Sequence, residues 1–254
     1  FHLPIIGLCT DSPSNISGTS KAYAHFLLGK SKNLDGYIAL TDSLGELFNI
    51  NSHPQLILEG VIEDKLPAKV ENTYGKYFFF GGALLPRYGI YQLIEAFKSI
   101  NNEEIKLLIC GHHADKKKLE CAIKDNNNIQ FLGLLPVNKV LELEQNAVLN
   151  INPRPYSEDL DRYSIPSKTL EYLSSGTLTL SVRNSKLQCN FADCALWSKS
   201  HEVNDIKSQL EKALSLSEEE RKSLGNKARE RVLNLYSLSA VNKKLVNFIS
   251  YFNF

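Results

Sequence analysis

Short apolar runs alternate with helical stretches along the chain. Several of the runs lack polar alternation, which is typical of strands buried on both faces of a parallel sheet. In the clearest helical stretch, Ile90–Ile100, apolar side chains recur on one face. This alternation predicts an α/β fold built from Rossmann-like parallel sheets with flanking helices. The predicted strands are Pro4–Cys9, Tyr37–Leu40, Gln55–Leu58, Tyr77–Phe80, Lys106–Cys110, Ile129–Leu132, Val148–Ile151 and Leu178–Val182.

The polar and charged stretch Ile62–Gly75 is the best candidate for a linker between domains. It predicts a partial Rossmann-like domain over residues 1–61 and a fuller one over residues 74–236. Residues 237–254 then form a last helix that packs back toward the N-terminal part. Because the chain opens without Met on a strand-like segment, we expect it to be a piece of a longer protein.

Composition narrows the class of protein. The net charge of +1 predicts no long-range attraction to nucleic acid. The five cysteines include no C-x-x-C pair, which argues against a disulfide scaffold or a zinc site and favours a reducing compartment. No apolar run is long enough to span a bilayer, and no charged leader precedes the first strand. We therefore expect a cytoplasmic protein.

The last helical stretch, Leu238–Asn253, carries apolar side chains at helical spacing, with Lys243 and Lys244 off that face. One interpretation is a helix in peripheral contact with the inner face of a membrane. The other is a helix that packs on the N-terminal part of the chain. We favour the second.

A glycine-rich turn follows the strand that begins at Tyr77. The strand ends in Gly81 and Gly82, and a helix opens near Gly89. Glycines let a ligand approach the backbone closely, and a helix N-terminus suits phosphate. Arg87, just before this helix, has the planar guanidinium that binds phosphate through two hydrogen bonds. An ordinary tight turn with a solvated arginine is the alternative.

A second strand ends in glycine at Gly111, where ligands of open α/β sheets bind. His112 and His113 follow it directly. Adjacent side chains diverge in most backbone conformations, so this pair favours a loop lining over a metal site.

The segment Asn150–Gly176 carries the strongest signal. A strand runs into a polar loop, and a helix then opens at Pro166 and closes before Gly176. Lys168 and Glu171 are three residues apart and therefore share a face. This helix start offers an ammonium and backbone N–H groups to a diphosphate, and a carboxylate to a ribose. Spacing alone equally fits a surface salt bridge.

The order of these motifs resembles a known family. A strand followed by Gly81-Gly82, then Arg87-Tyr88-Gly89, and finally P-S-K-x-x-E-Y from Pro166 is similar to the C-terminal domain of family 4 glycosyltransferases of bacterial polysaccharide assembly. The likeness extends over residues 77–182. It implies a GT-B fold, in which a nucleotide sugar binds between two Rossmann-like domains and the partial first domain holds the acceptor. It also implies transfer with retention, without a cofactor or an essential metal.

The resemblance assigns roles to individual residues. It makes Glu171, Lys168 and Arg87 the catalytic candidates, with Glu171 on the ribose of the nucleotide. A first glutamate of the family motif would fall on Tyr163, so Glu158, Asp159 or Asp161 are the candidates to replace it. The family's second basic residue falls on Tyr88, and Lys168 and Arg154 are candidates for that charge. The remaining residues expected to bind the sugar donor are Gly81, Gly82, Gly111, Arg154, Tyr163, Ser164, Ile165, Pro166 and Ser167.

The expected function is thus a hexosyltransferase that takes a sugar from a nucleotide, with UDP favoured by family frequency, to a saccharide or lipid-linked saccharide. By itself, this piece is expected to transfer little sugar. Two alternatives stay open: a nucleotide-sugar epimerase of GT-B type, and a non-catalytic module that binds sugar nucleotides. A nicotinamide-dependent oxidoreductase is disfavoured, since no G-x-G-x-x-G follows a strand with an acid about 20 residues on.

Overall fold

The computed structural model describes residues 3–15, 19–49, 52–112 and 115–252. The chain divides into two compact units. Unit 1 comprises Phe1–Asp64, Ser157–Pro166 and Leu233–Phe254, and unit 2 comprises Lys65–Tyr156 and Ser167–Val232. Unit 1 therefore gathers three separate segments of the chain.

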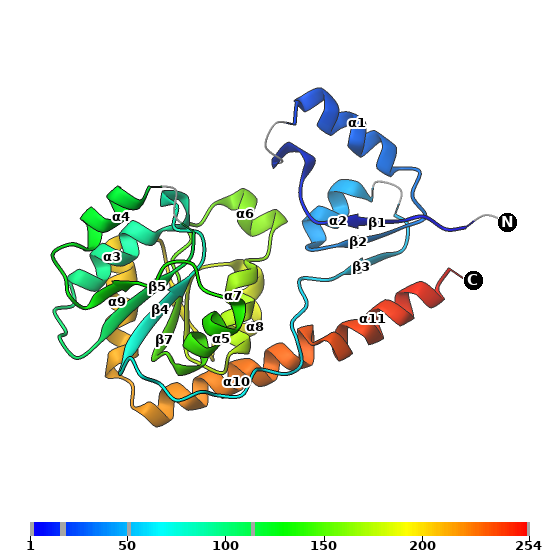
Figure 1. Cartoon of the computed structure of the whole chain (residues 1–254). Coiled ribbons are helices and arrows are strands. Elements are labelled where there is room, and N and C mark those ends of the chain that lie inside the picture. The colour runs from blue at the N-terminus through cyan, green and yellow to red at the C-terminus, as the bar shows by residue number, and fades with distance from the viewer. Residues whose placement is uncertain (1–2, 16–18, 50–51, 113–114, 253–254) are drawn as a thin grey trace. The chain divides into compact units, whose positions relative to one another are not determined.

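Unit 1 contains a parallel three-stranded sheet in the order β1-β2-β3 (Figure 1). Its strands are β1 (Ile6–Cys9), β2 (Gly36–Ala39) and β3 (Gln55–Ile57). Its other elements are the 3-10 turn η1 (Pro13–Asn15) and the helices α1 (Lys21–Ser31), α2 (Asp42–Phe48), α6 (Glu158–Tyr163) and α11 (Leu238–Ser250).

The core of unit 1 is small and lies between the sheet and α2. It consists of Cys9, Tyr37, Ala39 and Leu44, and the ring of Tyr163 packs against it. α11 packs against β3. Beyond the end of α11, the ring of Phe252 lies so close to Gly36 that a Cβ there would be 2.5 Å from it. The last helix and the first strands thus belong to one packed unit.

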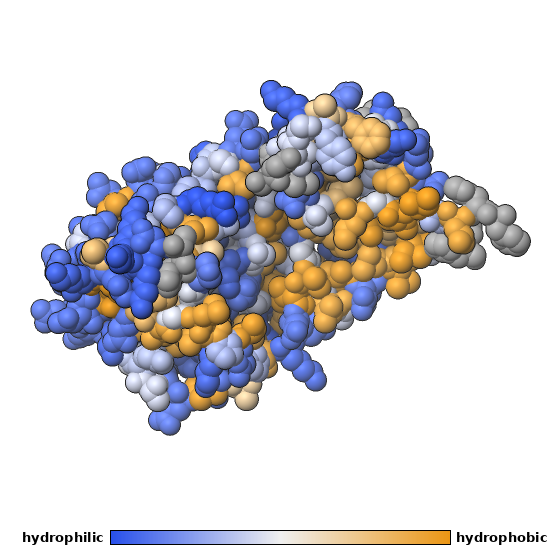
Figure 2. All heavy atoms as spheres, turned by 45° about the horizontal axis from the view of Figure 1, so that its top comes forward, coloured by the Kyte–Doolittle hydropathy of each residue, from blue (hydrophilic) through white to orange (hydrophobic). Residues whose placement is uncertain are grey.

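Many hydrophobic side chains of unit 1 remain exposed. Figure 2 shows hydrophobic residues gathered on the surface of this unit, at the right of the view. The large hydrophobic residues of unit 1 with exposed side chains are Leu3, Ile5, Leu8, Tyr23, Phe26, Val61, Leu238, Val246, Ile249 and Tyr251. None of the helices in the described ranges is long and apolar enough to cross a membrane.

Unit 2 is built on a six-stranded parallel sheet in the order β6-β5-β4-β7-β8-β9. Its strands are β4 (Tyr77–Gly81), β5 (Lys106–Cys110), β6 (Ile129–Phe131), β7 (Leu149–Asn152), β8 (Thr179–Val182) and β9 (Leu196–Ser198). Its helices are η2 (Pro86–Tyr88), α3 (Ile90–Lys98), α4 (Lys116–Ile123), α5 (Val137–Asn146), α7 (Ser167–Ser174), α8 (Ser185–Phe191), α9 (Val203–Ser215) and α10 (Glu218–Tyr236), the last of which continues into unit 1 (Figure 1).

The strands of unit 2 alternate their side chains between two packed faces. Phe78 and Phe80 of β4 face the larger core, which is closed by apolar side chains of α3 and α9. Tyr77 and Phe79 face the smaller core, where they meet Leu143 of α5 and Tyr172 of α7. Burial on both faces explains why these strands read as unbroken apolar runs in the sequence.

The predicted α/β fold is confirmed, and each of the eight predicted strands is present within two residues of its expected ends. A capping box opens α10: the N–H of Glu220 donates to Ser217 Oγ at 3.1 Å, and the N–H of Ser217 donates to Glu220 Oε2 at 2.7 Å. The prediction of a polar loop after β7 is wrong in part, because the segment contains a helix. Its acids form α6, capped by Ser157, whose Oγ accepts from the N–H of Leu160.

Candidate functional site

The carboxyl ends of the unit 2 strands meet at one edge of the sheet because all of them run parallel. β4 ends in Gly81, Gly111 follows β5, and Asn152 ends β7. The strand ends contact one another closely, since a Cβ on Gly111 would lie 1.8 Å from the carbonyl oxygen of Gly82. Gly111 also has φ of +134°, so only glycine fits there without strain.

Two arginines gather around Tyr88 at this edge. The guanidinium of Arg87 lies 5.2 Å from the centre of the Tyr88 ring, and that of Arg154 lies 5.5 Å from it. Arg87 comes from the loop after β4 and Arg154 from the loop after β7, so the ring joins the two loops. Arg154 thus brings a second positive charge to Tyr88, the position at which the sequence resemblance leads us to expect a basic residue.

Helix α7 is fixed to the sheet by polar side chains. The N–H of Gly81 donates to the hydroxyl of Tyr172 at 2.9 Å. Thr169 Oγ1 accepts from Nδ2 of Asn152 at 2.8 Å and lies 3.1 Å from Ser181 Oγ. The four side chains and Gly81 are all buried, so these contacts define how α7 lies on β4, β7 and β8.

Lys168 and Glu171 lie side by side on α7, as their spacing predicts. Lys168 Nζ is 2.9 Å from Glu171 Oε1, and the two side chains are 29% and 34% exposed. Lys168 Nζ also lies 5.5 Å from the centre of the Tyr172 ring. Both members of the pair are therefore only partly open to solvent, whereas each of the other i,i+3 and i,i+4 pairs in the described part of unit 2 has at least one partner that is more than half exposed.

A third charged residue, Glu144 of α5, joins this pair. Its side chain is 1% exposed, and its Oε1 lies 3.7 Å from Lys168 Nζ. Neither carboxyl oxygen has a hydrogen-bond partner among the described residues. Burial above all, and then the charge of Glu171, raise the pKa of Glu144 well above its usual value, while Lys168 opposes the rise.

Glu144 was not predicted from the sequence, although a signal exists. Val140, Leu143 and Ala147 pack on the smaller core, and Glu144 occupies the remaining position of their i, i+3, i+4, i+7 pattern. An acidic side chain on the buried face of a helix is rarely found without an oppositely charged partner, and Lys168 is that partner.

The four consecutive residues Tyr163, Ser164, Ile165 and Pro166 belong to unit 1. Tyr163 ends α6 with its ring against the core of unit 1, and the N–H of Ser164 donates to the carbonyl of Leu160. Ile165 is buried, and Pro166 directly precedes α7, which begins at Ser167. The candidates Glu158, Asp159 and Asp161 lie in the first turn of α6.

Nothing in the described ranges forms a metal site: no three His, Cys, Asp or Glu side chains there are placed to hold an ion. His112 lies in the loop after β5, whereas His113 falls outside the described residues.

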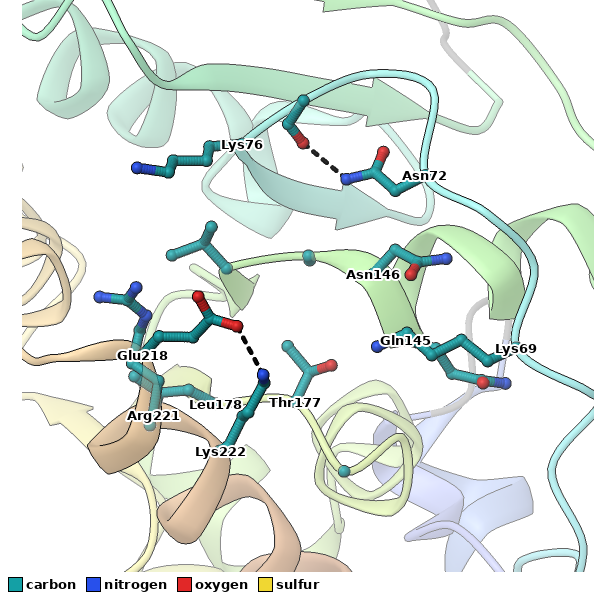
Figure 3. A pocket seen from close by; sticks show the side chains of 14 residues that line it. Lys69, Asn72, Lys76, Gln145, Asn146, Thr177, Leu178, Glu218, Arg221 and Lys222 are labelled. Carbon is teal, nitrogen blue, oxygen red and sulfur yellow. Dashed lines mark hydrogen bonds and ion pairs between the residues drawn. The ribbon is translucent and has the colours of Figure 1, made fainter.

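A separate hollow of about 310 Å³ lies at the opposite, amino edge of the unit 2 sheet (Figure 3). Lys76, which precedes β4, and Leu178, which precedes β8, line it. Gly176 and the pair of Glu218 and Lys222, whose charged atoms are 2.5 Å apart, complete its wall. This hollow is therefore distinct from the strand ends where Lys168, Arg87 and Gly111 lie.

Residues 61–231 match the protein family described as "Glycosyl transferases group 1", and the chain belongs to this family. Its α/β architecture matches that of solved GT-B glycosyltransferases. None of the curated proteins that were compared matches the chain.

Three solved structures illustrate the likeness. Sucrose-phosphate synthase from Thermosynechococcus elongatus has a TM-score of 0.78 at 14% identity, over 99% of this chain and 68% of that one. Alr3699/HepE from Anabaena, in complex with UDP and glucose, has a TM-score of 0.74 at 12% identity, over 98% of this chain and 72% of that one. S. aureus TarM, in a complex that includes UDP, has a TM-score of 0.72 at 15% identity, over 96% of this chain and 50% of that one. At these identities the likeness shows the fold, and this chain spans between half and about seven-tenths of those proteins.

Proposed function

We propose that unit 2 binds a nucleotide sugar and that the chain acts in a retaining glycosyltransferase, which moves a hexose to a saccharide or lipid-linked saccharide. The observation that carries the proposal is the pair of Lys168 and Glu171, held side by side on a helix that polar contacts fix to the sheet edge. A cation and a carboxylate so placed match a diphosphate and the ribose next to it.

Each charged side chain has a task in this proposal. Lys168 and Arg87, with Arg154 beside Tyr88, bind the diphosphate, and the N–H groups at the start of α7 add to the positive potential. During transfer the bond between the sugar's anomeric carbon and the phosphate oxygen breaks, a bond to the acceptor oxygen forms on the same face, and the proton of the acceptor hydroxyl passes to the departing phosphate oxygen. Negative charge then grows on the departing diphosphate, and fixed cations stabilise it.

UDP is the favoured nucleotide. The Anabaena and S. aureus structures that resemble this chain are described as complexes containing UDP. In this proposal Glu171 contacts the ribose and not the base. Because the ribose is common to all three, UDP-, GDP- and ADP-sugars should be screened together by calorimetry. Tightest binding of a UDP-sugar is expected, and no binding of any of the three would contradict the proposal.

The same titration with a chelator tests for a metal. Since the cations of this edge are proposed to meet the phosphate charge, affinity should be unchanged in EDTA. A loss of affinity restored by magnesium or manganese would contradict this part of the proposal. Product analysis separates a transferase from an epimerase, because only transfer requires an acceptor.

A further inference from the structure

The cluster of Glu144, Lys168 and Glu171 holds two carboxyl groups and one ammonium. Lys168 Nζ is 2.9 Å from Glu171 Oε1 and 3.7 Å from Glu144 Oε1. Glu171 is partly exposed and Glu144 is almost fully enclosed. The cation therefore lies between a carboxyl at the surface and a carboxyl in the interior.

A buried carboxylate without hydrogen bonds is unfavourable unless a cation stays next to it or it takes up a proton. The other groups that face Glu144 supply no charge at neutral pH. Burial raises the pKa of the Cys110 thiol to about 11 and raises the pKa of Tyr172, so both stay neutral. On its own helix, Lys139 is paired with Glu142 at 2.6 Å. The state of Glu144 thus depends on Lys168 and Glu171.

We propose that Glu144 is a positioning residue of the sugar-donor site, which holds Lys168 beside Glu171 in the free protein and takes up a proton when Lys168 turns to a bound diphosphate. The proposal rests on the proposed function of this site. When the ligand's negative charges engage Lys168, the interior carboxylate loses its cation. One proton from the solvent then converts the carboxylate of Glu144 into a neutral carboxyl group.

The sign of the resulting pH dependence follows from linkage. If the complex binds more protons than the free protein, affinity falls as pH rises from the range in which free Glu144 loses its proton to the range in which bound Glu144 loses it. UDP-glucose is a suitable probe because its diphosphate is esterified at both ends, so it lacks the terminal phosphate proton that titrates near pH 6 and keeps its charge over about pH 5.5–8.5. Any uptake of protons over this range belongs to the protein.

The direct test is calorimetry of UDP-glucose binding near pH 7 in buffers of different ionisation enthalpy. Wild-type protein should take up a measurable fraction of a proton, and Glu144→Gln should take up none while still binding. Glu142→Gln removes an acid of the same helix that is paired outside the cluster, so it should behave like wild type. Proton uptake by Glu144→Gln equal to that of wild type would overturn the proposal.

A second measurement needs no ligand. A group whose pKa is raised by folding contributes stability below its unfolded pKa and loses that contribution as pH rises through its folded pKa. Removing Glu144 should therefore shift the difference in melting temperature, Glu144→Gln minus wild type, in favour of the variant between pH 5 and pH 8. Glu142→Gln should show no such shift.

The outcomes distinguish this inference from the proposed function. Absence of UDP-glucose binding by the wild type contradicts the proposed function and the linkage together. Binding without proton uptake contradicts only the role of Glu144. Should Glu144→Gln fail to fold, ¹³C resonances of the wild-type glutamate carboxyls, titrated with and without UDP-glucose, decide the matter: a carboxyl that becomes protonated on binding supports the proposal, and its absence overturns it.

Discussion

The two faces of the unit 2 sheet are built from different chemistry. On one face, Leu149 and Ile151 of β7 join an apolar core under α3 and α9. On the other, the same strand turns Asn150 and Asn152 inward, toward buried polar groups of α5 and α7. Apolar contacts have no preferred direction, whereas hydrogen bonds do. We infer that the first face chiefly stabilises the unit and that the second fixes the orientation of α7.

The largest expected effect lies on the apolar face. Phe78 is fully buried and meets the ring of Phe97 edge to face at 6.2 Å. Phe78→Ala should lower the free energy of unfolding by about 3–5 kcal/mol, because it leaves a cavity in the larger core. Urea denaturation measures this loss. A cost below about 1 kcal/mol would mean that this face does not dominate stability.

Tyr172→Phe probes the polar face and should cost less. The hydroxyl accepts from the N–H of Gly81 at 2.9 Å, and its removal leaves that buried group unpaired, at about 1–3 kcal/mol. Because the bond holds α7 to the end of β4, affinity for UDP-glucose should also fall.

Tyr77→Phe is the matched control for this prediction. Its hydroxyl is buried on the same face and donates to the carbonyl of Leu143 at 2.8 Å, away from α7. A similar loss of stability with unchanged affinity is expected. If both variants lose affinity for UDP-glucose equally, the polar face affects binding only by stabilising unit 2, and not by orienting α7.

Glu171→Ala should weaken nucleotide binding with little change in stability. A carboxylate can accept two hydrogen bonds from a ribose, each worth roughly 1.5–3 kcal/mol, so affinity should fall about tenfold or more. The lost pair with Lys168 should cost below about 0.5 kcal/mol of stability. Calorimetry and thermal denaturation measure the two effects.

Glu142→Ala gives the comparison for Glu171→Ala. Glu142 pairs with Lys139 at the same i,i+3 spacing, at 2.6 Å, on a helix of the same unit. Its removal should leave affinity unchanged. Equal affinities of wild type and Glu171→Ala would show that Glu171 is only a surface partner of Lys168.

The sequence predicts the sheet well because burial on both faces leaves unbroken apolar runs. The runs ending at Gly81 and Cys110 became β4 and β5. The strand Leu196–Ser198 was not predicted, since three residues with a serine at the end carry no periodicity. Helix α6 was not predicted either, because its acids read as a loop and no apolar stripe marks it.

The candidate site shows a different limit. The spacing of Lys168 and Glu171 on one helix is a local property and was predictable. Glu144 lies 24 residues before Lys168 in sequence, on another helix, and only the packing of α5 beside α7 brings the two together. Arg87 and Arg154 likewise meet at the ring of Tyr88 only because β4 and β7 are neighbours in the sheet. Such contacts follow from strand order, which periodicity does not reveal.

The smallest expected effect is at the opposite edge of the same sheet. Gly176 lies two residues after the end of α7 with φ of +80°, the left-handed conformation that glycine adopts after helices. In Gly176→Ala the new Cβ would lie 3.5 Å from the nearest atom, Arg229 Cδ, which is ordinary contact, so the cost is backbone strain of about 1 kcal/mol. Urea denaturation should show this loss, while affinity for UDP-glucose should match that of wild type. The substitution alters the far end of the helix that carries Lys168 and Glu171 and leaves the contacts of Tyr172 and Thr169 in place. A fall in affinity would therefore mean that the polar contacts do not fix the start of α7 independently of its end.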